Sequence, residues 1–259
     1  MSNKECLTRT DDIIIKRGTK RIPFPGEYVV KAVHKANDTF VRFSKVNEEL
    51  DLFAILGMRN LSALVGEVYA SCLKNVTNGL LLKNPHQDGY PDLLLMDDYG
   101  KKVYNRITFK QDKVPFSPFI GGGIEVKATC GDVPTPKECS KRNIKKPEVG
   151  DTRVELLTGY VWKAHHRKTN NLIGLLWDFK NRIPYISALF YSSNLSEKDW
   201  GKIVQPKENA GRTTSVSIMK RGGVKRMSQE CLYCENNETL LAFLSRYNHL
   251  DIRSQFDVI

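Results

Sequence analysis

Apolar residues that recur at helical spacing mark one long helix in the first third of the chain. The pattern extends from about Asn47 to Lys74, and its apolar positions are mostly three or four residues apart. They are Leu61, Leu64, Val65, Val68 and Cys72. Residues at this spacing share one face, so we predict an amphipathic helix that packs on a sheet. The first 45 residues carry short apolar runs at Ile13–Ile15 and Tyr28–Val33, and we assign no chemistry to them.

Short apolar runs bounded by polar turns predict the strands of that sheet. The runs Leu93–Met96 and Val103–Phe109, with a polar turn between them, have the pattern of a β-hairpin. A further strand ends at Thr129, and Ser196 is placed to cap a short helix. Three more strands are predicted at Leu156–Ala164, Leu172–Trp177 and Tyr185–Tyr191. These elements predict an α/β fold with a central mixed β-sheet of five or more strands flanked by helices.

Length and composition favour one folded unit. The chain has 259 residues, of which 41% are hydrophobic, enough to bury a substantial core. No linker-like segment divides it, so we predict a single domain over residues 1–259. The N-terminus from Met1 to Cys6 is polar, and no apolar run approaches the length that spans a membrane. The sequence therefore predicts a soluble, intracellular protein with no membrane partner.

Ionic side chains stand beside two of the apolar runs. Asp92 directly precedes Leu93–Met96, and Glu125 and Lys127 follow the glycine triplet 121–123. Because Glu125 and Lys127 are two residues apart, they share one face of a strand. If the two strands pair, two carboxylates converge on one hard divalent cation, with the lysine beside them. A buried charge needs such a partner, so we predict a metal site with two carboxylates and one lysine.

The residues Pro91, Asp92, Glu125 and Lys127 resemble the motif of the PD-(D/E)xK nuclease superfamily. In that superfamily, a Pro-Asp pair on one strand and a Glu-x-Lys on the next carry magnesium-dependent hydrolysis of phosphodiester bonds. The resemblance implies one or two Mg²⁺ ions per active site. Their ligands would be the carboxylates of Asp92 and Glu125 and the main-chain carbonyl of Val126.

The resemblance also assigns a role to Glu67. Many members of the superfamily carry an acidic residue on the helix before the Pro-Asp strand, and Glu67 is the residue of the predicted helix that matches it. It would bind a second metal ion or orient a water molecule. A surface glutamate with no catalytic role is the alternative.

The motif has one structural alternative, and the chain contains one competing match to it. Glu125 and Lys127 also fit a surface strand that carries an ion pair between residues two apart. A second Asp-x-Lys pair, Asp178 and Lys180, follows another apolar run. It has no Pro-Asp strand at short range upstream and is followed by a turn, so we interpret it as a solvated strand end.

Basic residues outnumber acidic residues and are unevenly placed. The chain has 40 Lys and Arg against 29 Asp and Glu, a formal net charge of +11. Residues 101–168 hold fifteen basic and seven acidic side chains, and residues 202–226 hold seven and one. A basic face favours a polyphosphate partner, because binding releases condensed counterions. A generally basic, soluble surface is the alternative.

Two basic excursions, near residues 130–150 and 205–227, are the predicted DNA contacts. The first leaves the strand of Glu125 and is too long for an ordinary connection. The second alternates hydroxyl and apolar residues before basic ones, as a strand laid on DNA would, or as a polar edge strand would. The predicted DNA-binding residues are Arg142, Asn143, Lys145, Lys146, Arg212, Thr213, Thr214, Ser215, Lys220 and Arg221.

The sheet, the metal site, the basic excursions and the size together look like a type II restriction endonuclease. That resemblance implies a homodimer that grips double-stranded DNA and cuts at a specific site, in the cytoplasm of a bacterial or archaeal cell. Two other functions remain open. A structure-specific or repair nuclease of the same superfamily would share the catalytic residues, and a non-catalytic DNA-binding protein would share only the basic surface.

Cysteines and histidines add little to this prediction. The chain has six cysteines, and most are expected to be free thiols in an intracellular protein. Cys231 and Cys234 have the spacing of half a zinc site, but a structural site needs four ligands, so structural Zn²⁺ is not expected. His165 and His166 would face opposite ways on a strand, which favours contact with solvent or phosphate over a shared metal ion.

Overall fold

The computed structural model describes residues 5–46, 51–86, 89–110, 120–205 and 215–256. A seven-stranded mixed sheet forms the centre of this part of the chain, in the order β1-β11-β9-β8-β6-β5-β4. The strands are β1 (Cys6–Thr8), β4 (Leu81–Lys83), β5 (Leu93–Leu95), β6 (Gly123–Thr129), β8 (Leu172–Lys180), β9 (Ile183–Ser192) and β11 (Cys231–Glu235). Strands β6 and β8 are parallel, and the other neighbours are antiparallel.

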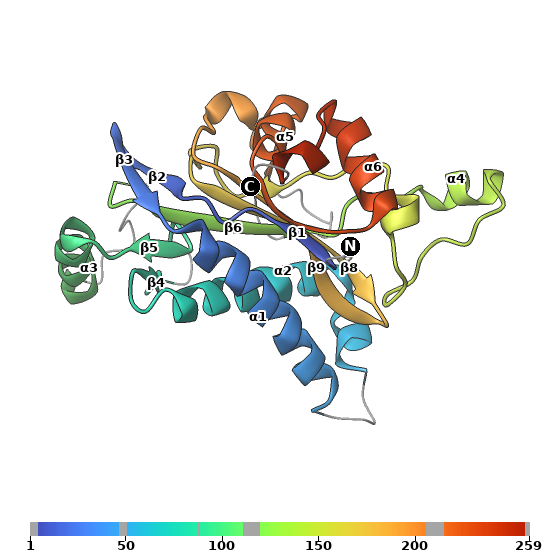
Figure 1. Cartoon of the computed structure of the whole chain (residues 1–259), viewed down its shortest axis with the longest axis horizontal. Coiled ribbons are helices and arrows are strands. Elements are labelled where there is room, and N and C mark those ends of the chain that lie inside the picture. The colour runs from blue at the N-terminus through green and yellow to red at the C-terminus, as the bar shows by residue number, and fades with distance from the viewer. Residues whose placement is uncertain (1–4, 47–50, 87–88, 111–119, 206–214, 257–259) are drawn as a thin grey trace.

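Helices cover both faces of the sheet, as Figure 1 shows. One face carries α1 (Gly26–Ser44) and α2 (Leu52–Val76), and the other carries α5 (Arg221–Ser228) and α6 (Glu238–Asn248). The predicted α/β fold, a mixed sheet flanked by helices, is therefore confirmed. The long amphipathic helix predicted from Asn47 to Lys74 is confirmed in part: α2 begins at Leu52 and ends at Val76, but it consists of two helices, Leu52–Met58 and Asn60–Val76, that meet at a sharp bend.

The sheet is buried on both faces because residues of its central strands alternate between two apolar layers. On β8, Ile173 and Leu175 pack in the layer with α1 and α2, whereas Leu172 and Leu176 pack in the layer with α5 and α6. Burial on both sides explains why β8 reads as a continuous apolar run. The strands predicted at Leu172–Trp177 and Tyr185–Tyr191 are confirmed as β8 and β9.

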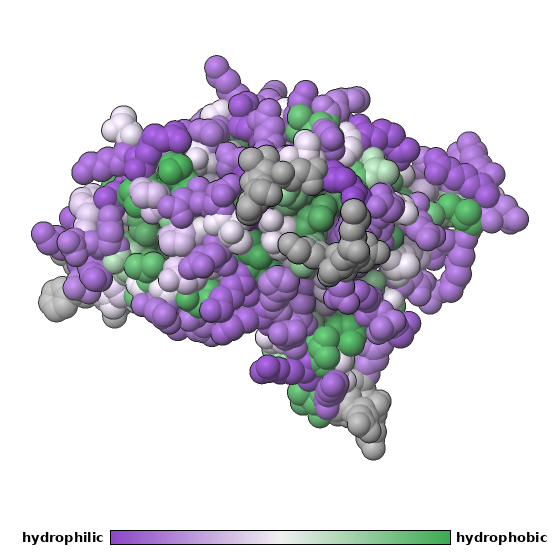
Figure 2. Space-filling view, in the orientation of Figure 1, coloured by the Kyte–Doolittle hydropathy of each residue, from purple (hydrophilic) through white to green (hydrophobic). Residues whose placement is uncertain are grey.

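Smaller elements surround this core. The paired strands β2 (Ile13–Arg17) and β3 (Lys20–Phe24) form a hairpin, and β7 (Lys163–Ala164) pairs with β10 (Ser217–Ile218). The remaining elements are α3 (Asp98–Lys110), α4 (Pro136–Lys141) and the 3₁₀ turns η1 (Val154–Leu156), η2 (Glu197–Asp199) and η3 (Arg253–Gln255). Figure 2 shows hydrophilic residues over most of the visible face, including the projecting segment around α4.

The predicted hairpin after Asp92 is wrong in its second half. Strand β5 is present, but the run Val103–Phe109 lies in the helix α3. The residues that we interpreted as a hairpin turn begin this helix: the Asp97 carboxylate accepts the Gly100 N–H at 2.8 Å, and its main-chain oxygen accepts the Lys101 N–H at 2.8 Å. An apolar pair four residues apart, as at 103 and 107, fits one helix face as well as one strand face.

The strand predicted at Leu156–Ala164 is mostly wrong as well. Only Lys163–Ala164 is a strand, and Val154–Leu156 is a 3₁₀ turn. The intervening chain lies over β8, where the Trp162 indole N–H donates to the Leu175 carbonyl at 3.1 Å. A segment that buries alternate side chains on a sheet face has the same apolar pattern as a strand within the sheet.

The short run at Tyr28–Val33 did not reveal the helix α1, in which it lies. Its buried residues include Val29, Val33, Ala36 and Phe40, at the three- and four-residue spacing of a helix face. The short helix predicted after Ser196 is present as the single 3₁₀ turn η2, with Ser196 as its N-cap.

Helix α2 has a sharp bend near its start. Gly57 has φ 65°, a left-handed conformation that glycine adopts without steric penalty. Among the described helices no single one is both long and apolar enough to cross a membrane. The pair Leu52–Met58 and Asn60–Val76, bent by 108°, meets that test by length and composition when taken together.

The chain before β7 packs tightly on β8 through Trp162, so one added methyl group on β8 should lower the stability of the fold. A Cβ atom on Gly174 would lie 2.5 Å from a ring carbon of the buried Trp162. We expect Gly174→Ala to lower the free energy of unfolding by about 1–3 kcal/mol, measured by urea denaturation. Gly222→Ala in α5 is the control, because no atom lies within 4 Å of its added Cβ. Equal stability of the two variants would contradict this packing.

Candidate active site

Pairing of β5 with β6 brings the two predicted carboxylates together. The antiparallel register aligns Leu93 with Ile124, which sets Asp92 across from Glu125. The Asp92 N–H donates to Oε2 of Glu125 at 3.2 Å, and the Val126 N–H donates to Oδ2 of Asp92 at 2.8 Å. Each carboxylate is therefore held by the main chain of the other strand.

Lys127 completes this cluster from the same face of β6. Its Nζ lies 2.6 Å from Oε1 of Glu125 and 3.4 Å from Oδ2 of Asp92. The Glu125 side chain is fully buried, and that of Lys127 is 20% exposed. The structure thus brings together the three charged residues of the predicted motif, and it contradicts the alternative of an exposed ion pair on a surface strand.

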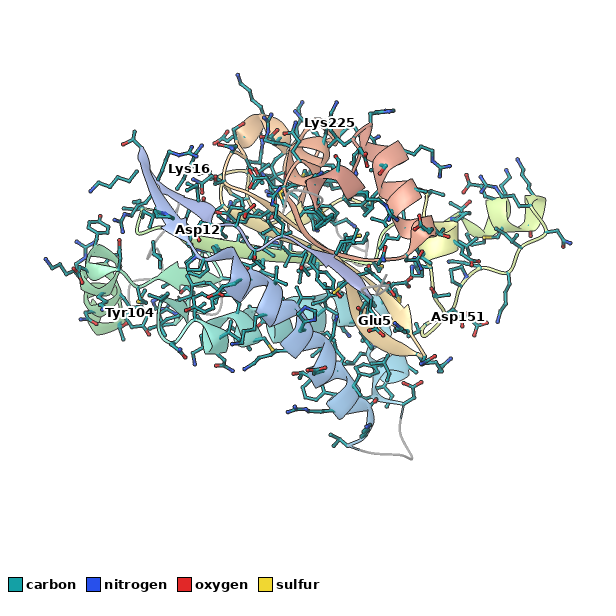
Figure 3. The ribbon with its side chains drawn as sticks, in the orientation of Figure 1. Glu5, Asp12, Lys16, Tyr104, Asp151 and Lys225 are labelled. Atoms are coloured by element: carbon teal, nitrogen blue, oxygen red, sulfur yellow. The ribbon has the colours of Figure 1, made fainter. Side chains whose placement is uncertain are left out.

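A buried asparagine, which sequence analysis missed, supports the start of β6. The Asn171 carbonyl accepts the Glu125 N–H at 3.0 Å. Its side chain accepts the Lys16 N–H at 2.9 Å and donates to the Lys16 carbonyl at 2.7 Å. Figure 3 labels Lys16 on the hairpin that this contact ties to the sheet. Nothing in the sequence distinguishes Asn171 from other polar residues at a strand start.

The pKa values of both Asp92 and Lys127 lie above their ordinary values, for different reasons. Burial raises the pKa of Asp92 from 3.8 to about 6, and the Glu125 carboxylate adds to that rise, whereas the Lys127 ammonium opposes it. Burial alone would lower the pKa of Lys127, but the two carboxylates outweigh burial and raise it above its ordinary value. Lys127 therefore stays cationic, and Asp92 ionises at a higher pH than an ordinary aspartate.

The donor set fits a hard divalent cation. Two carboxylates face one ammonium, so one negative charge is in excess at the cluster. Oε1 of Glu125 is buried and accepts no hydrogen bond of regular geometry from the described residues, although Lys127 Nζ lies close to it. No three His, Cys, Asp or Glu side chains in the described ranges are grouped to hold a metal ion. Magnesium suits such a site, because it takes one or two carboxylates and completes its shell with water and phosphate.

Glu67 lies at the same cavity but outside the hydrogen-bonded cluster. The cavity measures about 310 Å³, and Glu67, Asp92 and Lys127 are among its lining residues. The Glu67 side chain is 66% exposed and forms an ion pair with Lys83. After burial and Glu125, it is a further charge that raises the pKa of Asp92. This position is compatible with a residue that binds a second metal ion or orients a water molecule, and equally with a surface glutamate that has no catalytic role. Both stay predictions.

The structure adds His166 to the surroundings of the cluster. Its Nδ1 accepts the Lys168 N–H at 3.2 Å, and its ring meets the edge of Tyr90 at a centroid distance of 4.1 Å. Burial lowers its pKa to about 4, and Lys127 contributes in the same direction. A neutral ring whose Nδ1 accepts a hydrogen bond carries its proton on Nε2. That nitrogen is buried and has no hydrogen-bond partner within the described ranges.

His165 has a different environment from His166. It lies on the cavity wall near Lys127, and its Nδ1 is 2.9 Å from the Ser215 carbonyl. Both histidines lie in a bend after β7, so our reason for separating them, alternation along a strand, was wrong. Neither sequence position nor residue type indicated which of the two would be buried.

The predicted DNA-binding residues are divided between two segments. Arg142 caps the C-terminus of α4, and Asn143, Lys145 and Lys146 follow it in the chain. Lys145 pairs with Glu148 at 3.0 Å, and both side chains are exposed. In the second segment, Ser215 precedes β10, Lys220 is the N-cap of α5 and Arg221 begins α5. Arg212, Thr213 and Thr214 lie outside the described residues.

The competing Asp-x-Lys pair has a structural role. The Asp178 carboxylate accepts main-chain N–H groups of Arg153 and Val154 at 2.9–3.0 Å, and the Thr152 hydroxyl at 3.0 Å. Lys180 lies 3.7 Å from Glu235. Asp178 therefore anchors the loop before η1, which corrects our interpretation of a merely solvated strand end.

The two cysteines with zinc-like spacing are buried on β11. The Cys231 thiol donates to the Tyr233 carbonyl at 3.5 Å, and the Cys234 thiol donates to the Glu235 carbonyl at 3.4 Å. Its hydrogen bond with Cys231 and burial raise the pKa of the Cys234 thiol well above its ordinary value.

Comparison with other proteins adds no relative to this description. No protein-family model matches the chain, and neither the curated proteins nor the solved structures contain a match. The function must therefore be inferred from the residues and their geometry.

The raised pKa of Asp92 predicts how its replacement changes stability with pH. Because the folded-state value of about 6 lies above the ordinary 3.8, ionisation of Asp92 destabilises the fold progressively as the pH rises through this window. Without divalent cations, we expect Asp92→Asn to gain about 1–2 kcal/mol of stability over wild type at pH 7, and little at pH 4. Urea denaturation at several pH values measures the difference.

The exposed Asp38 of α1 offers a matched control. Asp38→Asn removes the same charge at the surface and should stay within about 0.5 kcal/mol of wild type throughout. A gain by Asp92→Asn that is equally large at pH 4 would show that charge at Asp92 is not its cause.

Proposed function

We propose that the chain is a magnesium-dependent endonuclease that cleaves double-stranded DNA at specific sequences. The proposal rests on one observation: Asp92, Glu125 and Lys127 converge from two paired strands, with both carboxylates within 3.4 Å of the lysine Nζ. The basic composition supports a nucleic-acid substrate, with 40 Lys and Arg against 29 Asp and Glu.

Metal-assisted hydrolysis suits this arrangement. Magnesium held by Asp92, Glu125 and the Val126 carbonyl would polarise the scissile phosphate and lower the pKa of a bound water. The Lys127 ammonium, kept cationic by its two carboxylate neighbours, stabilises the negative charge that develops on the phosphate.

The two antiparallel strands of the proposed duplex substrate favour a dimeric enzyme. Cleavage of both strands of a duplex needs two active sites related by a two-fold axis, because the strands are antiparallel. Each chain carries one such cluster among its described residues, so we propose a homodimer on DNA.

Substitution of the carboxylates tests the catalytic assignment. We expect Asp92→Ala and Glu125→Gln to lower magnesium-dependent plasmid cleavage on the order of a thousandfold, because each removes an oxygen ligand of the metal. DNA affinity without divalent cations should be unchanged or higher, since less negative charge then faces the phosphates. Gel-based cleavage rates and a binding titration measure the two effects.

Lys180 provides a matched control for the lysine. We expect Lys127→Ala to lower the cleavage rate on the order of a hundredfold or more. Lys180→Ala should cut like wild type, because Lys180 belongs to the competing Asp-x-Lys pair outside the proposed active site. Full activity of either carboxylate variant would overturn the proposed active site.

The products of plasmid digestion separate the candidate nucleases. A sequence-specific enzyme converts one plasmid into discrete fragments whose sequenced ends share a short motif. A structure-specific or repair nuclease would leave intact duplex uncut and cleave branched or damaged DNA. Absence of magnesium-dependent cleavage on all of these substrates would instead favour a non-catalytic DNA-binding protein.

A further inference from the structure

A second cavity, separate from the active site, lies where four elements meet. It measures about 500 Å³ and is lined by residues from the end of α4, η1 and the chain after it, the start of α5 and the end of α6. Three of its lining residues are arginines: Arg142, Arg221 and Arg246. We call it the arginine pocket. In Figure 3, Lys225 marks α5, and Asp151 marks the chain shortly before η1.

The lining of the arginine pocket carries a net positive charge. Within the described part of the chain, none of the three arginines forms an ion pair, and all three side chains are exposed. Glu155 is the one acidic residue in the lining. Three arginines and one glutamate in the lining of one concave surface give it an excess of positive charge, which favours an anionic ligand.

An aromatic wall gives this pocket a rigid side. The Arg221 guanidinium lies over the Tyr247 ring, 3.7 Å from its centroid. The Tyr247 ring stacks on Phe243 at 5.4 Å, and Gly159 lets it approach the main chain closely. Stacking restrains Arg221 before any ligand binds, which reduces the entropy lost on binding.

The pocket unites two segments that the sequence presents as separate. Arg142 comes from the excursion near residues 130–150, and Arg221 comes from the one near 205–227. Both were predicted to contact DNA, yet they are 79 residues apart in the chain. Arg246, from α6, joins them only in the tertiary structure. Basic residues from three distant places thus surround one binding surface.

One continuous piece of chain connects this pocket to the active site. Thr158 lines the arginine pocket, and His165 lines the cavity of Asp92 and Lys127. Seven residue steps separate them, so their Cα atoms are at most about 25 Å apart. That span is shorter than one turn of a DNA duplex, about 34 Å. A single duplex is long enough to reach both places.

We propose that the arginine pocket binds a backbone phosphate of the DNA duplex, less than one helical turn from the phosphate that is cut. The inference rests on the proposed function, since it needs a DNA substrate. Planar guanidinium groups match the oxygen atoms of a phosphate in pairs, and contacts of this kind set the position of a protein on DNA without reading its sequence. The pocket therefore positions the duplex for cleavage at Asp92, Glu125 and Lys127.

The test is a double variant, Arg142→Ala with Arg246→Ala, which leaves the stacked Arg221 in place. Duplex affinity is measured by fluorescence anisotropy at several salt concentrations, without divalent cations. We expect binding to weaken on the order of tenfold or more, and the slope of log affinity against log salt to fall by about 1 for each arginine removed. Replacement of both residues by lysine should keep most of the salt slope, because the charges remain.

A control variant removes the same charge from the opposite layer. Lys31 and Arg42 are exposed on α1, on the other face of the sheet, and form no ion pair within the described ranges. Lys31→Ala with Arg42→Ala should bind DNA like wild type. Thermal unfolding of all variants checks that each is folded, and the exposed positions make loss of the fold unexpected.

The possible results distinguish this inference from the proposed function. Equal affinity and salt slope for wild type and the Arg142/Arg246 variant would overturn the arginine pocket alone. An equal loss in the α1 control would also overturn it, because net charge would then explain the effect. Pocket-dependent binding by a wild-type protein that cuts no DNA would overturn the proposed nuclease and the positioning role of the pocket, and would leave only its phosphate binding. A wild-type protein that binds no duplex would overturn both.

Discussion

Two buried carboxylates share one ammonium where β5 meets β6, and the proposed metal site depends on that imbalance. Nζ of Lys127 lies within 3.4 Å of both Asp92 and Glu125 but can neutralise only one of them. The raised pKa of Asp92 expresses the remaining unfavourable charge. A divalent cation would relieve it, whereas an ordinary ion pair of one acid and one base has no such need. Asp178 illustrates the contrast, because main-chain N–H groups already satisfy its carboxylate.

The fold holds this cluster rigid by burying the sheet around it. Strand β6 pairs with β8 on one side and β5 on the other, so main-chain hydrogen bonds fix the positions of Glu125 and Lys127. Asn171 links the start of β8 to both β6 and the β2–β3 hairpin. Side chains on rigid, well-packed strands keep their geometry better than side chains on loops, which suits catalysis.

Outside the cluster of Asp92, Glu125 and Lys127, the fold gathers arginines that are far apart in the sequence. Arg142 follows α4 and Arg221 begins α5, and the structure brings both to one pocket together with Arg246. Packing of Tyr247 against Phe243 and Gly159 forms one wall of this pocket. Packing of the apolar core thus brings together arginines that lie in separate basic segments of the sequence.

Local patterns in the sequence determined much of the fold. The helical spacing in α2 and the apolar runs of β8 and β9 identified these elements, because each buries a face or both faces against the core. The same patterns failed at α3 and at the chain before β7. A pair of apolar residues four apart suits a helix or a strand, and a loop packed on a sheet face imitates a strand. Only tertiary contacts distinguish these cases.

For the site, the sequence alone determined the residue types and their spacing, which place Glu125 and Lys127 on one strand face. The tertiary structure decided what surrounds them. It set the register that puts Asp92 opposite Glu125, left His166 less exposed than His165, and brought Asn171 and Arg246 into place. Alternation along a strand is a local property of the chain. Burial, register and convergence depend on residues far apart in sequence, so they are decided only when the chain packs.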